Sequence, residues 1–552
     1  MTNVHDSQNI EGTRVGKEFV RKSSGLVRVM SPYSAFAYNV LNIGVIFPWV
    51  YLLSLALFPN ANVTLGILLT GIFTIFLAIA YSGIAVTMPR TGGDYIFQSR
   101  TLKPYLGFAI VATMIIVFFF QWAAISGWLV SVLGLAPMFM GFGLIYHNMT
   151  LVNLSSFFLT PTGIWITTII TGALATVILS FGFKWFVKIQ WWMWYGFLLS
   201  TILMIILFAL TPTTSFISKF NNNMAFLTPS IHNYYQYVYT QSIKSGFTPY
   251  TGKGFSFIAS LAVMPIALTS LGWVGYAQEQ AGEIQKASSL KHQFFINVGG
   301  GIFSTILMML LSFFLIRSVG QQWLAAAAYG NYLTAQVSMP IAPWFSDLAV
   351  VLTNNPVLFF LLIIGIFLNA VQIVFNVAVG WTRVAFAMSM DRVLPKYLSN
   401  VNSRLHTPVL AYLTYFILGY VLMGYIYNFV PSYIYFALAV TAVATIMYTG
   451  TALGASLLPF VKKQIYQTSP ISKYKIGKIP LITLSGGIAV GFSIWMLAYY
   501  ILNPGYGVSS PLSDTLMVLI FIFWIVYYFV RRAWLKKKGI ELDFVYKEVP
   551  PT

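Results

Sequence analysis

The sequence predicts an all-α integral membrane protein with twelve transmembrane helices. Of its 552 residues, 58% are apolar and only 8% are charged, whereas charged residues make up about 25% of a soluble domain. Long uncharged runs recur between turn signals, and each is close to the roughly 20 residues that a helix needs to cross a bilayer. The strands of a lipid-facing β-barrel would instead be runs of about ten residues in which apolar and polar residues alternate, and the runs here are longer. This composition excludes a soluble or disordered chain.

The twelve predicted spans run almost from one end of the chain to the other. They cover 34–58, 64–88, 105–134, 161–182, 187–210, 255–279, 293–317, 357–382, 408–428, 433–458, 480–502 and 512–531. Two connections on one side are long, 211–254 and 318–356, and their aromatic residues and prolines indicate ordered lids with short surface helices.

The distribution of basic residues predicts the orientation. The net charge is +19, from 31 basic and 12 acidic residues. With twelve spans, 27 of the basic residues fall on the side shared by both termini, and only Lys219, Lys244, Lys253 and Arg317 fall on the other. Basic residues accumulate on the cytoplasmic ends of membrane helices. We therefore expect a multi-pass protein of the plasma membrane with both termini cytoplasmic, and no nucleic-acid partner.

The residue types needed for most enzymatic sites are missing or dispersed. Cysteine is absent, so disulfides, thiolate metal sites and thiol catalysis are excluded. The histidines fall in predicted loops or at helix ends, without the facing pairs that bind haem or copper. No phosphate-binding Walker loop follows a strand. We expect no enzymatic activity, no catalytic residues, no cofactor and no metal site.

Two predicted spans contain a glycine next to a polar residue near their middle. They are span 1, at 42–48 (NIGVIFP), and span 6, at 269–276 (TSLGWVGY). Such glycines often only allow close helix packing. However, the two spans are five apart, so they would have opposite directions in two inverted halves. Interrupted helices at matching places in such halves indicate a transporter binding site.

An interrupted helix could hold a zwitterion without charged side chains. The N-terminus of a half-helix offers N–H groups to a carboxylate, and unwound carbonyls accept from an ammonium group. Asn42 adjoins the first break, so we favour it over the other amides within spans, which more often bond neighbouring helices. The predicted substrate-binding residues are Asn42, Ile43, Gly44, Val45, Ile46, Leu271, Gly272, Trp273 and Gly275.

Three segments resemble motifs of the amino acid–polyamine–organocation (APC) superfamily. Residues 89–95 (PRTGGDY) are similar to the P-x-S/T-G-G-x-Y/F loop of amino acid permeases. Residues 382–395 (TRVAFAMSMDRVLP), with the V-N and T-P that follow, resemble the superfamily's R-x-x-F/Y-A-M segment. Gly275-Tyr276 and the later E-I-Q-K at 283–286 resemble its G-F/Y…E-V/I-x-K/N run.

The resemblance implies a LeuT-like fold, in which two inverted five-helix repeats enclose a central site and two further helices follow. It also implies alternating access, with Trp273 as an aromatic lid over the substrate; packing is an equally strong reading for this residue. The implied organisation is an N-terminal cytoplasmic segment 1–30, a first repeat 31–210, an outer loop 211–254, a second repeat 255–458, two final spans within 459–534 and a cytoplasmic tail 535–552.

The sequence departs from the family pattern in two places. The usual I-G-S/A-G run of span 1 lacks its second glycine, because Val45 follows Gly44. The register of the carboxylate-binding amides is therefore open by a residue or two. The lysine deep in span 5 of some proton-coupled relatives is also absent, since Lys184 and Lys188 lie at the end of that span.

Glu279 and Glu283 are the only carboxylates that the sequence places near a helix, four residues apart and so on one face. The family register puts Glu283 at the cytoplasmic mouth, where Arg90, Arg383 or Lys286 could pair with it. Gating is favoured there over proton relay, and Glu279, which is deeper, is the better proton carrier. We interpret the Asp391 carboxylate as bonded to loop amides or to Arg90.

We expect a secondary active transporter of amino acids, with neutral or bulky apolar ones as substrates, because no predicted mid-membrane residue would neutralise a charged side chain. Proton coupling is the first choice and Na⁺ coupling the alternative. The outer loops carry only two acidic residues, Asp347 and Asp514, as expected of a face that works in acidic surroundings. Polyamine or nucleobase transport and amino acid exchange are alternatives, and a channel or nutrient sensor is less favoured. Direction and oligomeric state stay open.

Overall fold

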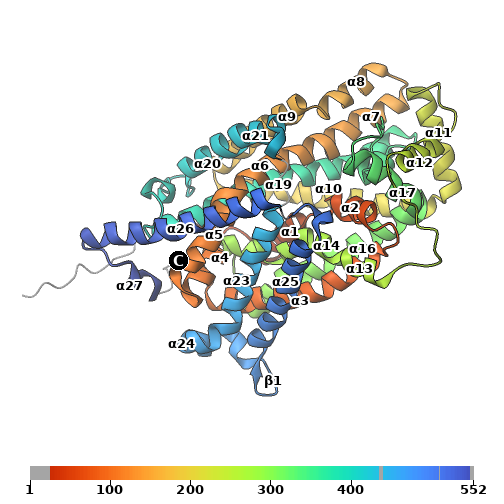
Figure 1. Ribbon diagram of the computed structural model, residues 1–552. Helices are drawn as coiled ribbons and strands as arrows, with labels where there is room; N and C mark the ends of the chain where they lie inside the picture. Colours follow the sequence, from red (N-terminus) through yellow and green to blue (C-terminus); the bar gives the residue numbers. More distant parts are fainter. Residues whose placement is uncertain (1–24, 434–438, 509, 548–552) are drawn as a thin grey trace, which may run out of the picture.

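The computed structural model describes residues 25–433, 439–508 and 510–547 (Figure 1). Within these ranges the chain is almost entirely helical, and its one sheet is a hairpin of β1 (Lys475–Ile476) and β2 (Ile479–Pro480). The all-α class is therefore confirmed. Most of the predicted N-terminal segment and the end of the predicted tail lie outside the described residues.

Eleven helices in the described ranges are long and apolar enough to cross a membrane. They are Val63–Thr87, Pro104–Ile145, Pro161–Ser180, Phe183–Leu210, Phe257–Glu283, Leu290–Val319, Pro356–Met390, Val409–Phe429, Val440–Val461, Leu481–Leu502 and Pro511–Lys537. They correspond in order to predicted spans 2 to 12. Span 3 is longer than expected because its helix continues to Ile145. Residues 434–438, at the start of predicted span 10, lie outside the described ranges.

Several of these helices change their winding along their length. The uninterrupted ones are α3 (Val63–Thr87), α9 (Pro161–Ser180), α10 (Phe183–Leu210), α19 (Pro356–Met390), α23 (Val440–Val461), α25 (Leu481–Leu502) and α26 (Pro511–Lys537). Four of these described spans are composite. Span 3 consists of α5 (Pro104–Val111), η1 (Ala112–Phe118), α6 (Phe119–Trp128), η2 (Leu129–Leu135) and α7 (Ala136–Ile145), and span 6 of α13 (Phe257–Ala262), α14 (Met264–Leu271) and η3 (Gly272–Glu283). Span 7 consists of α15 (Leu290–Phe294), η4 (Phe295–Gly299) and α16 (Gly300–Val319), and span 9 of α20 (Val409–Tyr415), η7 (Phe416–Met423) and α21 (Gly424–Phe429).

Short helices fill the connections, including both long ones. They are α4 (Gly93–Thr101), α8 (Met149–Phe158), α11 (Thr213–Leu227), α12 (Tyr234–Lys244), α17 (Gln321–Ala327), η5 (Ala328–Leu333), α18 (Phe345–Ala349), η6 (Lys396–Ser399), η8 (Pro431–Tyr433), α24 (Lys463–Thr468), η9 (Pro470–Lys473), η10 (Pro504–Tyr506) and α27 (Leu542–Lys547). The connections 211–254 and 318–356 thus carry the short helices that the sequence predicted.

Span 1 is interrupted, as predicted. It consists of α1 (Pro32–Ile43) and α2 (Trp49–Leu57), joined by a non-helical turn at 44–48. Gly44 ends α1 in the left-handed conformation, with φ of 76°, which glycine adopts without steric cost. Pro48 then stands at the start of α2. Proline is tolerated there because the backbone N–H groups of the first turn take no part in helical hydrogen bonds.

Span 6 differs from the prediction in the form of its interruption. The α-helix ends at Leu271 and continues directly as η3, a 3₁₀-helix of 12 residues with non-helical backbone angles at Trp273 and Gln280. The chain is therefore rewound and kinked rather than opened. Runs of 3₁₀-helix longer than about four residues are uncommon and often mark a functional hinge. Span 6 therefore changes its winding within the predicted segment 269–276, but the chain stays coiled there.

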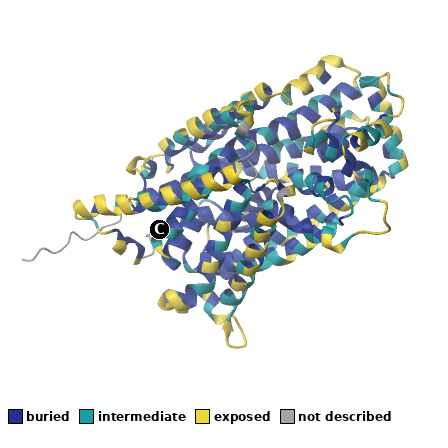
Figure 2. Ribbon diagram, viewed as in Figure 1, coloured by how far each residue is buried: buried dark blue, intermediate teal, exposed yellow. Residues whose placement is uncertain are grey.

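The centre of the molecule is tightly packed, and α19 lies inside it (Figure 2). α10 packs along α19, and a Cβ added at Gly365 would lie 2.0 Å from the Gly196 carbonyl oxygen. Small residues let membrane helices approach this closely. By contrast, the outer sides of α9, α10 and α26 expose large apolar side chains, as surfaces in contact with lipid do.

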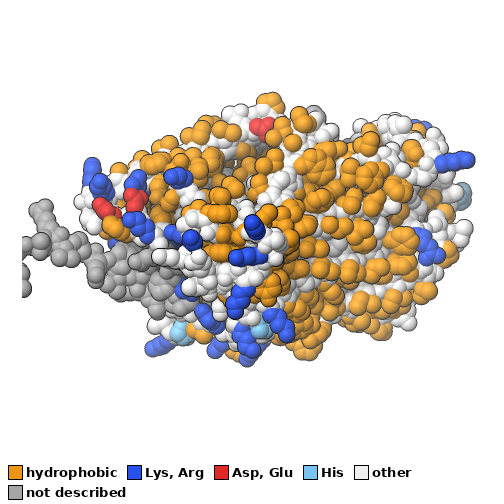
Figure 3. All heavy atoms as spheres, turned by 90° about the horizontal axis from the view of Figure 1, so that it is seen from below, with side chains coloured by type: hydrophobic (Ala, Val, Ile, Leu, Met, Phe, Trp, Pro, Cys, Tyr) orange, Lys and Arg blue, Asp and Glu red, His pale blue; other side chains and the backbone are white. Residues whose placement is uncertain are grey.

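The two ends of the helix bundle differ in charge (Figure 3). We call the end that carries α4, α24 and α27 the terminal face, at the left of Figure 1, and the end that carries α11, α12 and α17 the opposite face. Most of the Lys and Arg side chains visible in Figure 3 lie at the terminal face, beyond a broad hydrophobic surface. The uneven distribution of basic residues along the sequence therefore corresponds to a concentration of positive charge at one end of the bundle.

Candidate functional site: a central cavity and its gate

A small cavity lies between the break in span 1 and the rewound part of span 6. Its lining consists of Asn42, Phe47, Phe119, Trp122, Trp273, Tyr276, Ile373 and Val377. Five of these eight residues are aromatic, two are aliphatic and one is an amide. No acidic, basic or imidazole side chain is among them. The cavity is therefore suited to an uncharged, largely apolar group.

The turn at 44–48 is held open by local contacts. The Phe47 N–H donates to the Gly44 carbonyl at 2.9 Å, and the Tyr51 hydroxyl donates to the Val45 carbonyl at 2.7 Å. A Cβ at Gly44 would lie 2.3 Å from the Phe47 ring. Any other residue at Gly44 would thus meet both backbone strain and a steric clash, so this glycine sets the shape of the break.

Asn42 is oriented by amides of α19. The Asn376 amide donates to the Asn42 side-chain oxygen at 3.2 Å, and Asn376 and Gln372 bond each other at 2.8 and 3.1 Å. The Asn369 amide donates to the Leu41 carbonyl, at the end of α1. The three α19 amides therefore bond neighbouring groups, as is usual for such residues in spans, while Asn42 also lines the cavity.

Trp273 lies at the centre of an aromatic group. Its ring contacts those of Phe119, Trp122, Tyr276 and Tyr448, at centroid distances of 5.3 to 5.8 Å and steep angles. Such edge-to-face pairs are favourable beyond the area they bury. Trp273 thus both packs and borders the cavity, so the geometry is compatible with both readings that the sequence left open.

The other predicted binding residues do not line this cavity. Ile43, Val45 and Ile46 are buried around the break, and Leu271 is buried at the end of α14. A Cβ at Gly272 would lie 2.6 Å from the Tyr448 ring, and one at Gly275 would lie 2.2 Å from the Tyr81 ring. These two glycines therefore allow close packing of span 6 against α23 and α3, which is the alternative reading of such glycines.

Sequence reasoning missed six of the lining residues. Phe119 and Trp122 are three apart on α6, and Ile373 and Val377 are four apart on α19, so each pair shares a helix face. Phe47 and Tyr276 adjoin the two glycine-containing segments. Spacing alone could not separate these residues from the many other apolar residues in the spans. The indole N–H of Trp122 is buried and has no hydrogen-bond acceptor in the described chain.

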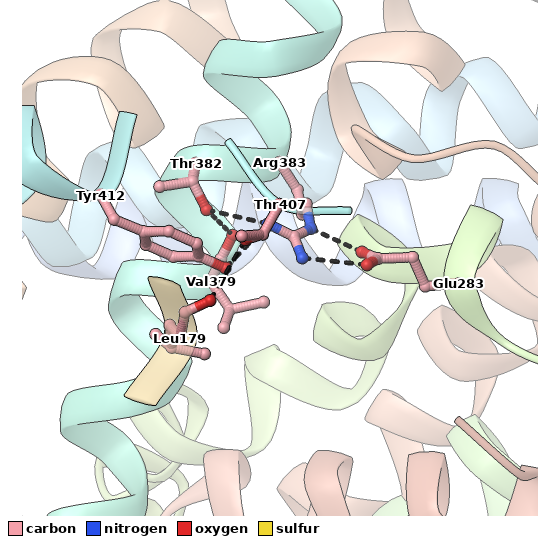
Figure 4. A network of polar contacts seen from close by, with 7 residues as sticks. All are labelled: Leu179, Glu283, Val379, Thr382, Arg383, Thr407 and Tyr412. Carbon is pink, nitrogen blue, oxygen red and sulfur yellow. Dashed lines mark hydrogen bonds and ion pairs between the residues drawn. The ribbon is translucent and has the colours of Figure 1, made fainter. Parts of the chain in front are cut away.

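A buried ion pair joins the end of η3 to α19 (Figure 4). Arg383 on α19 binds Glu283 at the end of η3 with two bonds, Nε to Oε2 at 2.5 Å and Nη2 to Oε1 at 2.9 Å. Arg383 also donates to the Tyr412 hydroxyl at 2.8 Å. Both charged side chains are about 1% exposed or less. Of the three partners that the sequence offered for Glu283, the structure selects Arg383.

A second buried ion pair is formed at the end of α19. Arg100 of α4 binds Asp391 at 2.6 Å, and the Tyr95 hydroxyl donates to the same carboxylate at 2.8 Å. The Arg100 guanidinium lies between the rings of Tyr95 and Tyr546, 5.5 and 5.1 Å from their centroids. The two pairs, Arg383–Glu283 and Arg100–Asp391, are called the terminal gate below.

Arg100 is thus a partner of Asp391 that the sequence analysis did not offer. The spacing of the sequence motifs could not predict that Arg100 lies next to the end of α19. Arg90 is half-buried and donates to the Pro89 carbonyl at 3.4 Å. Burial lowers the pKa of its guanidinium, and the charge of nearby Arg28 lowers it further.

Glu279 contacts a second carboxylate that the sequence analysis missed. Its Oε1 accepts the Asp94 backbone N–H at 3.3 Å, while its Oε2 is buried without a hydrogen-bond donor in the described residues. The Asp94 carboxylate accepts bonds from the hydroxyls of Tyr81 and Thr451. Asp94 is 4% exposed in the first turn of α4, so Glu279 and Glu283 are not the only carboxylates near a helix.

Neither member of the Asp94–Glu279 pair has a basic residue within ion-pair distance in the described ranges. Burial raises the pKa of the Asp94 carboxyl, against the lowering effect of its hydrogen bonds. Two adjacent carboxyl groups in a low-dielectric interior cannot both be ionised without a large cost. A proton shared by the pair would remove this cost.

A helical bundle that crosses the membrane many times, with an uncharged cavity at its centre and a buried gate at one end, has the architecture of a membrane transporter. The amino acid permease family model matches residues 42–542, about nine-tenths of the chain. The chain therefore belongs to the amino acid permease family and is an amino acid transporter of a multi-pass membrane type. No curated protein matches the sequence.

Proposed function

We propose that this protein imports neutral amino acids with apolar side chains by alternating access, and that proton binding drives the uptake. The observation that carries the proposal is the uncharged cavity between Asn42 and Phe47 on one side and Trp273 and Tyr276 on the other. Its walls would bury an apolar side chain, and the break at 44–48 would supply backbone groups to the two charges of the amino acid.

The substrate's side chain must be uncharged to enter at low cost. A charged side chain would lose its hydration in a cavity whose only polar side-chain amide is that of Asn42. This argues against polyamines, which are the alternative that the superfamily leaves open. The free space in the cavity, about 10 Å³, has room for about one water molecule. An amino acid would therefore have to separate the aromatic rings around Trp273 to bind.

Alternating access would require the terminal gate to open. Glu283 ends the same 3₁₀ segment that carries Trp273 and Tyr276, so a substrate that moves η3 also moves one member of the Arg383–Glu283 pair. The break in span 1 and the altered winding in span 6, five spans later, support the inverted-repeat organisation. The basic side chains at the terminal face support a cytoplasmic location of that face in the plasma membrane.

Glu279 would be the coupling residue, with Asp94 as its partner. The pair joins α4, which carries Arg100 of the terminal gate, to η3, which borders the cavity. Loss of the shared proton would place two negative charges side by side and separate these elements. Na⁺ coupling remains the competing assignment, and exchange of one amino acid for another is a second.

A ligand screen on the purified chain tests the substrate class. Bound ligand stabilises a protein by mass action, about 2.7 kcal/mol at a concentration of 100 Kd. We expect apolar neutral amino acids to raise the melting temperature, and polyamines, nucleobases and acidic or basic amino acids not to. Stabilisation by a polyamine or nucleobase alone would contradict the proposed substrate.

Uptake into proteoliposomes tests the coupling. With an imposed pH gradient and fixed membrane potential, the wild-type protein should accumulate its substrate above the external concentration. Glu279→Gln should still equilibrate substrate but lose accumulation, whereas Glu541→Gln, which removes an exposed carboxylate at the terminal face, should behave as wild type. Uptake that needs Na⁺ and ignores pH would refute proton coupling.

A further inference from the structure

At the opposite face of the bundle, a segment that we call the lid, residues 320–355, packs against α2. It contains α17, η5 and α18 and connects α16 to α19. Its side chains are mostly buried: Trp323, Leu324, Phe345 and Leu348 are each at most 3% exposed. The lid is therefore packed onto the bundle rather than lying loosely over it.

One carboxylate lies within this apolar lid. Asp347, in α18, is 4% exposed and has a hydrogen bond from the Ser346 hydroxyl at 3.1 Å. Within the described ranges, no basic group lies at ion-pair distance from it. Lys219, which reaches the lid, donates instead to the Leu352 carbonyl at 2.8 Å. An ionised carboxylate would thus be buried there without a counter-charge, which is costly.

The elements packed against α18 offer no compensating charge either. They are η2, α7 and α19. Neither η2 nor α7 carries a titratable side chain, and the only one on α19 is Arg383, which is engaged in the terminal gate. The lid's own aromatic neighbours, Tyr332 against Trp344 and Tyr51 against Phe345, are neutral at physiological pH.

The lid is also connected to the cavity. The Phe345 ring meets the Tyr51 ring edge-on at 5.8 Å, and the Tyr51 hydroxyl holds the Val45 carbonyl in the break of span 1. α2, which carries Tyr51, also packs against η5. Movement of α18 away from the bundle would therefore remove a packing contact of Tyr51, the residue that bonds the turn at 44–48.

We propose that Asp347 is a proton-binding site of the lid: the protonated carboxyl lets the lid pack down on the bundle, and ionisation lifts it. The neutral acid needs no counter-charge, whereas the carboxylate is stable only where water reaches it. Burial raises the pKa of Asp347 well above its usual value, with its bond from Ser346 opposing the effect. An acidic medium on this face would thus favour the closed lid.

The inference rests on the alternating-access part of the proposed function, but its test needs neither substrate nor transport. The chain contains no cysteine, so a single introduced thiol reports on one place. Ala349, 2% exposed in α18, becomes accessible only when the lid lifts. The experiment follows maleimide labelling of Ala349→Cys in the purified full-length protein between about pH 5 and pH 9. The rate is divided by that of Ser230→Cys, an exposed reference on the same face, because thiol reactivity itself rises with pH.

With Asp347 present, the normalised labelling rate should rise with pH, at most about tenfold per pH unit for one proton. In Asp347→Asn the rate should be low at every pH, because the amide mimics the protonated acid. Asp514→Asn, which removes the exposed carboxylate at the start of α26, should leave the pH dependence intact. A pH-independent ratio in the protein with Asp347, or an unchanged pH dependence in Asp347→Asn, would overturn the proposal. Failure of the uptake assay alone would not affect it.

Discussion

The two ends of the molecule are packed through different kinds of buried contact. The terminal gate consists of two buried ion pairs with tyrosine hydroxyls and rings around them. The lid on the opposite face consists of aromatic and aliphatic packing around a single carboxylate, and no ion pair is found among its described residues. One end is held by charge and the other by apolar burial.

This difference gives each end a different sensitivity. A buried ion pair with several hydrogen bonds is specific in geometry, and its strength hardly varies across physiological pH. Removing one partner leaves an unpaired buried charge and costs about 3–5 kcal/mol. Apolar packing is non-directional and tolerates movement, but an unpaired carboxylate within it responds to protons. The terminal gate should therefore respond to mutation, and the lid to pH.

The largest effect is expected at Arg383. Arg383→Gln leaves Glu283 buried without its counter-charge, so we expect a loss of about 3–5 kcal/mol in the closed form, seen as a lower melting temperature and lost uptake. Arg383→Lys keeps the charge but not the two-bond geometry and should be intermediate.

The matched control is Arg532→Gln, which breaks the ion pair with Asp543. Its partners are 44% and 54% exposed, so the cost should be only about 0–1 kcal/mol. If Arg383→Gln were as mild as Arg532→Gln, the terminal gate would not be held by charge, and the contrast between the two ends would fail.

A smaller effect is expected at Tyr546. The buried ring of this residue in α27 covers Arg100, and its hydroxyl lies 3.3 Å from that of Tyr95. Tyr546→Ala should cost about 2 kcal/mol, because a desolvated cation–π contact is lost and water reaches the Arg100–Asp391 pair. Tyr546→Phe keeps the ring and should cost about 1 kcal/mol or less. Thermal unfolding of the two variants measures the difference, and equal losses would show that the ring is not what protects the pair.

The smallest effect, and one of opposite sign, is expected at Asp347. Burial raises the pKa of this carboxyl in the folded protein, whereas its pKa in the unfolded chain is about 3.9. Between these values the folded state holds a proton that the unfolded state has lost, so folding becomes less favourable as pH rises. Asp347→Asn should therefore melt a few degrees higher than wild type at pH 7, with the gap closing below about pH 4. A lower melting temperature at pH 7 would contradict the unpaired burial.

Most of the fold could be predicted from hydropathy, because lipid exposure demands long apolar runs. The interruption of span 1 was also predictable, since Gly44 and Pro48 are local causes of a break. Span 6 could not be predicted in the same way. Its glycines at 272 and 275 are explained by the neighbouring rings of Tyr448 and Tyr81, and these contacts depend on tertiary packing.

The candidate site was predictable only where a residue carried a local signal. Asn42 and Trp273 adjoin the glycine-containing segments, and both line the cavity. Asp94 and Arg100 gave no such signal: they lie in a short helix after a loop motif, and their roles come from partners 185 and 291 residues away, Glu279 and Asp391. A spacing rule reaches only a few turns along one helix, so such long-range pairs are outside its scope.

The winding of η3 has a mechanical consequence. Its backbone angles depart from helical values at Trp273 and at Gln280, so the segment bends between its aromatic end and Glu283. Because Trp273 lines the cavity and Glu283 binds Arg383, a change of the bend at Gln280 would shift the acidic end relative to the cavity.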